Sequence, residues 1–147
     1  MPEHENESTR KLSPSNEDYL EAVYQLGGAV KAIRSVDLAC KLDVSKASVN
    51  KAINNLKSAG LVDQPHYGDI SLTEKGLSYA RNIQNRHEIL SQFLTEVLGV
   101  EPERAQEEAC SMEHAISDET LDRWTGFMEN WRSDAFCESQ DAAQWKP

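Results

Sequence analysis

Three side chains that can bind a metal ion follow one another at helical spacing: Cys110, Glu113 and His114. Residues i, i+3 and i+4 of a helix share one face, so a thiol, a carboxylate and an imidazole would be stacked there. Asp18 and Glu21 place two carboxylates on one side of an earlier predicted helix. Taken alone, either pattern also fits a solvated helix edge, or acidic residues that complement a helix dipole.

A second imidazole, His87, comes from the middle of a long predicted helix. Together the oxygen, nitrogen and sulfur donors suit Mn(II), Fe(II), Co(II) or Zn(II) better than Ca(II) or Mg(II). The spacing does not show that the three segments meet. It predicts a transition-metal site wherever they do.

Two other functions would use the same residues. A thiol-based redox regulator would sense oxidants through Cys110, although the acidic neighbours Glu107 and Glu108 disfavour a reactive thiolate. A small metalloenzyme would need an open coordination position and a substrate cleft, and the sequence has no obvious nucleophile or second base. We therefore expect a binding protein and not an enzyme.

The charge of the chain is distributed unevenly. The net charge of -10 over 147 residues argues against nucleic acid, because phosphate contacts supply most non-specific DNA affinity. Residues 30–60, however, hold six basic and only two acidic side chains, whereas the segments before and after them are acidic. One basic segment inside an acidic protein is typical of a localised DNA-binding surface.

Helix signals in and around this segment predict a helix-turn-helix. A first helix is expected after Ser15 and ends at the glycine pair 27–28, and a short one runs from Ser35 to Leu42. Ser45 can cap a third helix that ends at Gly60. Two short runs, 61–62 and 70–72, then flank a turn and predict a β-hairpin, which makes the whole a winged helix.

The second half of the sequence predicts helices only. A long helix is expected from Thr73 to about Leu98, one from Pro102 to about Ile116, and a last one from Ser117 to about residue 133. Their apolar stripes exceed what a small helical unit can cover by itself, so we expect a homodimer, although packing within the chain is the alternative.

The sequence also bears on where in the cell the protein is located. The apolar stretches are too short to span a membrane and no signal segment opens the chain, so we expect a cytoplasmic protein that does not bind membranes. Its three cysteines form no C-x-x-C pair, so neither a disulfide framework nor a zinc knuckle is expected.

Several motifs together resemble the diphtheria toxin repressor family of iron- and manganese-dependent transcriptional regulators. They are the run Glu17–Glu21, the helix-turn-helix with Leu72–Gly76 after the wing, Arg86-His87, and Glu108–His114 followed by Ser117–Glu119. The resemblance covers roughly residues 15–130 and implies a dimeric repressor that binds palindromic operator DNA. The metal would lie between the DNA-binding and dimerisation domains, and the repressor would control metal homeostasis.

The resemblance also implies a ligand set. The residues at the family's ligand positions are Asp18, Glu21, His87, Cys110, Glu113 and His114. Asp18 and Glu21 are similar to the manganese-responsive branch, whereas Cys110 is similar to the iron-responsive branch. The implied ion is Fe(II) or Mn(II), with Co(II) or Zn(II) as substitutes. Ser91 and Gln106 stand where the iron branch carries a Glu and a His of an ancillary site.

The expected fold is mainly α with a small β-hairpin. We divide it into a disordered tail (1–14), a winged helix-turn-helix (15–75), a helical metal-binding and dimerisation domain (76–132) and a second tail (133–147). Asn50 and Lys51 have chemistry suited to base edges, and the wing would touch the DNA backbone. The residues expected at DNA are Arg34, Lys41, Ser45, Lys46, Ser48, Asn50, Lys51, Lys57, His66 and Tyr67.

Overall fold

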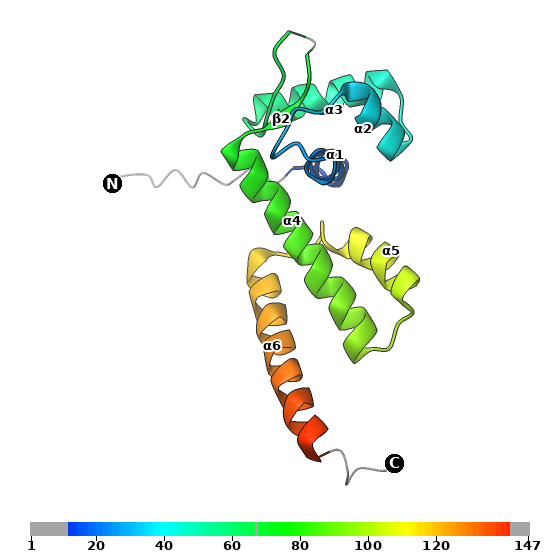
Figure 1. Ribbon diagram of the computed structural model, residues 1–147, viewed down its shortest axis with the longest axis vertical. Coiled ribbons are helices and arrows are strands. Elements are labelled where there is room, and N and C mark those ends of the chain that lie inside the picture. The colour runs from blue at the N-terminus through cyan, green and yellow to red at the C-terminus, as the bar shows by residue number, and fades with distance from the viewer. Residues whose placement is uncertain (1–11, 67, 142–147) are drawn as a thin grey trace, which may run out of the picture. The chain divides into compact units, whose positions relative to one another are not determined.

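The computed structural model describes residues 12–66 and 68–141, with side chains as far as residue 134 (Figure 1). The chain divides into two compact units between Gln84 and Asn85, inside one long helix. The expected domain boundary, after residue 75, lies nearer the start of that helix. Each unit is described separately below.

The N-terminal unit is a three-helix bundle with a small hairpin. Its helices pack on one another through a core that includes Leu20, Leu38, Val49 and Leu56, all wholly buried. The helices are α1 (Pro14–Gln25), α2 (Ser35–Leu42) and α3 (Lys46–Ser58). The turn between α2 and α3 follows Asp43, whose left-handed φ of 52° ends α2.

The wing is a two-stranded antiparallel hairpin. Strand β1 (Val62–Asp63) pairs with β2 (Ser71–Leu72), with Val62 opposite Leu72. An isolated bridge between Ile33 and Ile70 ties the hairpin to the segment before α2 through two backbone hydrogen bonds of 2.7 Å. The structure therefore confirms the expected winged helix-turn-helix and adds this third pairing.

The start of α1 differs from the expectation. Ser13, and not Ser15, is the N-cap: its hydroxyl accepts a 3.2 Å hydrogen bond from the Asn16 amide, and Pro14 opens the helix. Proline suits a first helical position because its missing N–H would have no intrahelical acceptor. Leu12, also expected in the N-terminal tail, packs against the core, and its amide donates a 3.2 Å hydrogen bond to the Tyr79 hydroxyl. Residues 1–11 of that tail lie outside the described residues.

The C-terminal unit consists of helices. Helix α4 (Glu74–Gln92) enters it from the first unit and continues into a π-helical turn, η1 (Phe93–Val97), before α5 (Pro102–Met112) and α6 (Asp118–Asp141). Leu90, Leu94, Ala105 and Ala109 form its small core. Phe93 packs edge-on against Trp124 and Phe127, with ring centroids 5.1 and 5.8 Å apart.

Two helix ends differ from the sequence prediction. Helix α5 ends at Met112 and not near Ile116, so Glu113 is its C-cap and His114 lies in the turn that follows. Helix α6 continues to Asp141, into the expected C-terminal tail, because residues 133–141 contain no Pro or Gly to stop it. A fading apolar stripe weakens the signal for a helix without ending one.

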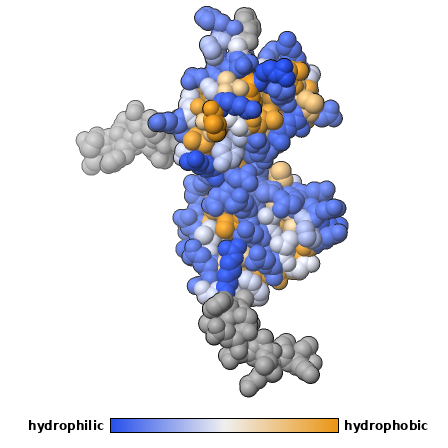
Figure 2. Space-filling view, viewed as in Figure 1, coloured by the Kyte–Doolittle hydropathy of each residue, from blue (hydrophilic) through white to orange (hydrophobic). Residues whose placement is uncertain are grey.

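Hydrophilic residues cover most of the face drawn in Figure 2, and hydrophobic residues form small separate areas among them. Among the described residues, no helix is long and apolar enough to cross a membrane.

Candidate metal centre and nucleic-acid interface

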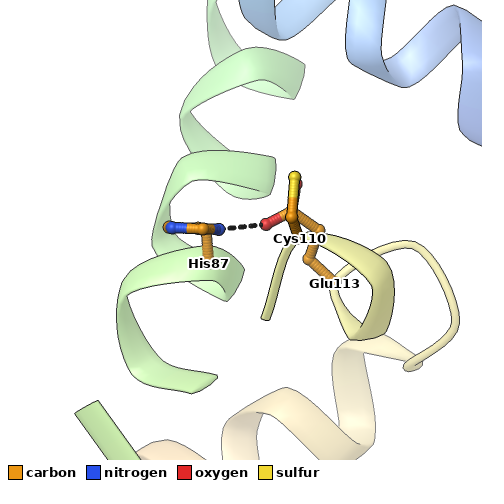
Figure 3. A group of neighbouring side chains, drawn as sticks. All are labelled: His87, Cys110 and Glu113. Atoms are coloured by element: carbon orange, nitrogen blue, oxygen red, sulfur yellow. Dashed lines mark hydrogen bonds and ion pairs between the residues drawn. The ribbon is translucent and has the colours of Figure 1, made fainter. Parts of the chain in front are cut away.

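Three of the predicted ligands meet within the C-terminal unit. His87 on α4, Cys110 on α5 and Glu113 at the end of α5 each offer a ligand atom, and these atoms lie within 4.8 Å of one another (Figure 3). The carboxylate and the sulfur both lie on the side of α5 that faces His87. The group brings one nitrogen, one sulfur and one oxygen donor together from two helices.

Glu113 is the centre of this group. Its carboxylate is fully buried, with Oε2 2.7 Å from His87 Nδ1 and Oε1 3.6 Å from His114 Nε2. Burying a carboxylate costs free energy unless charges or hydrogen bonds compensate it, and His87 contributes one such hydrogen bond here. A buried acid between two imidazoles, with a thiol beside it, is an arrangement that a divalent cation would stabilise.

Gln106 makes a contact that sequence reasoning did not find. Its Oε1 lies 2.5 Å from Nε2 of His87, while the other ring nitrogen faces Glu113. Residues 106 and 110 are four apart on α5, and that spacing was the available signal that Gln106 shares a face with Cys110. A ligand histidine is normally held by such a contact to its second ring nitrogen, which fixes the ring and the tautomer.

The donor set tests whether a transition metal fits. Four-coordinate and larger sites for Fe(II), Mn(II), Co(II) or Zn(II) use imidazole, carboxylate and thiolate, and all three are present here. Cys110 is exposed and His87 is partly exposed, so the group is accessible from solvent. The residues fit such an ion, and His87, Cys110, Glu113 and His114 are those of this unit that would hold it.

The other two predicted ligands belong to the N-terminal unit. Asp18 and Glu21 lie on α1, and Glu21 is only 6% exposed. Gln25, one turn later, donates a 3.3 Å hydrogen bond to Glu21 Oε1. Their part in the metal site stays a prediction.

The residues expected at DNA lie at the surface of the N-terminal unit. The α3 residues Lys46, Ser48, Asn50 and Lys51 are exposed, as are Lys41, Lys57 and His66, and Tyr67 lies outside the described residues. Ser45 has a structural role as well, because its hydroxyl caps α3 by accepting a 3.1 Å hydrogen bond from the Ser48 amide. Neither exposure nor capping tests DNA contact itself, which stays a prediction.

Two of the expected phosphate-binding residues already have partners. Arg34 donates two 3.0 Å hydrogen bonds to the Asp37 carboxylate, and Lys57 donates to the Gln64 carbonyl at 3.2 Å. The hydrogen bond from Arg34 and its positive charge lower the pKa of Asp37, and Asp37 raises the pKa of Arg34 in return. Asp37 therefore competes with a phosphate for Arg34.

Fold and site together define a class of protein. A winged helix-turn-helix with a basic, exposed third helix reads DNA, and the helical unit after it carries a transition-metal donor set. Proteins with this combination are metal-dependent transcriptional regulators. The chain belongs to the iron-dependent repressor family: residues 11–70 match the "Iron dependent repressor, N-terminal DNA binding domain" and residues 73–139 the "Iron dependent repressor, metal binding and dimerisation domain".

Individual relatives agree with this assignment. The chain is 38% identical to an HTH-type transcriptional regulator of Methanocaldococcus jannaschii over 82% of its own length and 98% of the relative's. It is also 38% identical to the transcriptional regulator MntR of Escherichia coli, over 77% of this chain and 72% of MntR.

Among solved structures, the manganese regulator SloR matches with a TM-score of 0.69 and 29% identity, over 80% of this chain and 55% of SloR. The metal-dependent transcriptional regulator MtsR matches with a TM-score of 0.71 and 28% identity, over 80% of this chain and 55% of MtsR. The chain thus spans about half the length of these two solved proteins. Members of the family are transcriptional regulators and not enzymes, so the expectation of a non-enzymatic DNA-binding protein is confirmed.

Proposed function

We propose that this protein is a homodimeric repressor that binds palindromic operator DNA in the cytoplasm when Fe(II) or Mn(II) occupies its metal site. The observation that carries the proposal is the His87–Cys110–Glu113 group in the unit that matches the metal-binding domain. Relatives support the choice of metal class, since one solved neighbour is a manganese-dependent repressor in complex with manganese.

The proposed ligand set is wider than this group. His114 shares the turn with Glu113, and Asp18 and Glu21 on α1 are the remaining ligands implied by family resemblance. A divalent cation, when bound, supplies the positive charge that lets several carboxylates and a thiolate lie close together. In the structure, His87 and His114 lie beside the Glu113 carboxylate, at 2.7 and 3.6 Å.

Regulation follows from where the ligands lie in the chain. Asp18 and Glu21 are part of the DNA-binding unit, while the other four belong to the helical unit. Sharing one ligand set between the units would restrict their arrangement and favour the one whose recognition helices match half-sites about one helical turn apart. The size of this shift is limited by the difference in metal affinity between the two states.

The identity of the metal depends on Cys110. Thiolate ligands favour Fe(II), Co(II) and Zn(II), whereas carboxylates suit Mn(II). With one thiol among several carboxylates, we place Fe(II) first and Mn(II) close behind. Selectivity in the cell also depends on geometry and on metal availability.

The proposed dimer would cover an exposed apolar face of the helical unit. Phe127 and Trp131, stacked with ring centroids 6.2 Å apart, are 45% and 40% exposed, and Leu98 is 60% exposed. The match to a dimerisation domain over residues 73–139 supports a second copy of the chain as the occupant of this face.

The test is a parallel titration. DNA duplexes that the protein binds would first be selected from a random pool at saturating Mn(II). The affinity for these duplexes would then be measured under anaerobic conditions as a function of the concentration of Fe(II), Mn(II), Co(II) or Zn(II). We expect DNA binding to rise with metal in the parent and to stay at its metal-free level in Glu113→Ala. Lys51→Ala should bind metal like the parent and lose DNA affinity. A Glu113→Ala protein whose DNA binding still responds to metal like that of the parent would contradict the proposed metal site.

A further inference from the structure

Arg86, beside the candidate ligand His87, is bound to the turn that carries two other ligands. We propose that Arg86 is the positioning residue of the metal centre, holding the turn with Glu113 and His114 against the helix that carries His87. The inference rests on the proposed metal site and assigns a role to a side chain that offers no ligand atom.

The contacts of Arg86 join three segments of the C-terminal unit. Its Nη1 donates to the backbone carbonyl of Glu113 at 3.2 Å and to that of Ile116 at 2.9 Å. Its Nη2 donates to Oδ1 of Asp118, the first residue of α6, at 2.5 Å. One guanidinium on α4 thus binds the end of α5, the connecting turn and the start of α6.

The turn needs such a partner because α5 ends early. After Met112 the carbonyls have no amide of a following helical turn to accept from, and carbonyls at a helix end must be satisfied by other donors. Arg86 supplies two of these donors from a side chain that is only 9% exposed. Because the Glu113 carbonyl is held directly, the backbone from which the Glu113 carboxylate extends is fixed relative to His87.

Arginine suits these contacts because two nitrogens of one rigid group make them. The guanidinium is planar and presents several donors in a rigid fork, whereas the ammonium of lysine is a compact point charge on a flexible stem. Lysine at this position would keep the charge, but its three donors lie on one nitrogen and could not replace the contacts that Nη1 and Nη2 make from two separate positions. Arg86→Lys therefore removes the positioning and keeps the electrostatics.

A matched control exists on the same pair of helices. Arg132 on α6 donates to the Gln92 side chain of α4 and lies 3.8 Å from the Glu96 carboxylate. Arg132 links α6 to the end of α4, whereas Arg86 links α6 to the middle of α4. Neither of these two contacts of Arg132 reaches the turn that carries Glu113 and His114. Arg132 is 48% exposed and Arg86 only 9%, so the two variants are compared by the metal affinity and spectrum of the folded protein and not by stability.

The experiment is a metal titration of the purified full chain with Co(II) and Mn(II). For Arg86→Lys we expect metal affinity to fall by about tenfold or more, the usual effect of losing an outer contact to a metal ligand. The Co(II) absorption spectrum should also change, whereas DNA affinity at saturating metal should equal that of the parent. Arg132→Lys should leave both the metal affinity and the spectrum unchanged.

A milder variant guards against misfolding. Asp118 is 76% exposed, so Asp118→Asn should preserve the fold while loosening the hold of Arg86, with metal affinity reduced roughly two- to fivefold, as expected for an ion pair whose carboxylate faces solvent. Parent-like metal affinity in Arg86→Lys would overturn the proposal, and so would equal losses in Arg86→Lys and Arg132→Lys. If Arg86→Lys does not fold, parent-like affinity in Asp118→Asn overturns it. A parent that binds no metal would instead overturn the proposed function.

Discussion

Among the candidate ligands, Glu113 and Cys110 differ most in their surroundings. Glu113 is fully buried between two imidazoles, and Cys110 is exposed one helical turn before it. A carboxylate oxygen is a ligand that all of the candidate divalent ions accept, so we expect Glu113 to contribute affinity for each of them. The exposed thiol contributes mainly to selectivity, because sulfur discriminates between metals and carboxylate oxygen does so less.

This difference predicts the behaviour of a Cys110→Ser variant. We expect affinity for Co(II) and Zn(II) to fall by about tenfold or more and affinity for Mn(II) to fall less, because only the softer ions lose a favoured donor. Competitive titrations and loss of the near-ultraviolet sulfur-to-Co(II) absorption band measure this. A variant with unchanged metal selectivity that no longer responds to peroxide would instead identify Cys110 as a redox sensor.

Single residues also show what could be predicted from the sequence. The donors of the C-terminal unit were found because helical spacing determines which residues share a face, and His87, Cys110 and Glu113 do meet. The role of Arg86 was not predicted, because its contacts span 27 or more positions and its side chain offers no ligand atom to draw attention to it. Gln106 was missed although it shares a helix face with Cys110.

At the scale of elements, several helix ends marked by glycine or proline were predicted well, although the start of α1 at Pro14 was not. Gly27, Gly60 and Gly99 all have positive φ after a helix, and Pro102 opens α5. The predicted end of α5 was wrong because no residue type in α5 marks it. The carbonyls of Glu113 and Ile116, beyond the helix, accept hydrogen bonds from Arg86. The predicted end of α6 was wrong because an exposed helix can continue without an apolar stripe in its last turns.

The junction between the wing and α4 gives a sharp element-level prediction. A Cβ added at Gly76 would lie 1.8 Å from the carbonyl oxygen of Leu61, so Gly76→Ala forces the backbones apart. We expect the free energy of unfolding to fall by about 1–3 kcal/mol or more, the usual cost of overpacking. Urea denaturation followed by circular dichroism measures it.

Gly126 provides the matched control for this substitution. It lies in α6, and a Cβ there would meet nothing within 4 Å. Gly126→Ala should raise stability by about 0.5–1 kcal/mol, because alanine loses less backbone entropy in a helix. If both substitutions changed stability equally, close packing at Gly76 would not be the reason for its glycine.

At the scale of the whole molecule, the exposed aromatic face bears on assembly. Trp131→Lys should shift the protein from dimer to monomer in sedimentation velocity experiments, because a charge would replace apolar area buried in the proposed interface. Asn130→Lys places the same charge on the neighbouring exposed residue and should leave the dimer intact. A dimer equally stable in both variants would place the interface on another face.

Charge distribution leads to a prediction about salt. The chain carries a net charge of -10, yet the basic segment of residues 30–60 contains the exposed α3 lysines. DNA affinity should therefore fall steeply with salt, and each phosphate contact removed should reduce the slope of log affinity against log salt by about 0.9. Lys46→Ala should show this reduction if Lys46 binds a phosphate, whereas Asn50→Ala should weaken binding without changing the slope.

Asp37 extends the same argument to a gain of affinity. Because its carboxylate engages Arg34 through two hydrogen bonds, Asp37→Asn removes a negative charge beside the DNA-binding surface and releases the guanidinium for a phosphate. We expect tighter DNA binding at low salt. The slope of log affinity against log salt should also be steeper, by about the contribution of one phosphate contact. Arg34→Ala combined with Asp37→Asn should return the slope to the parental value. A single Asp37→Asn variant with parental slope and affinity would show that Arg34 lies away from the DNA.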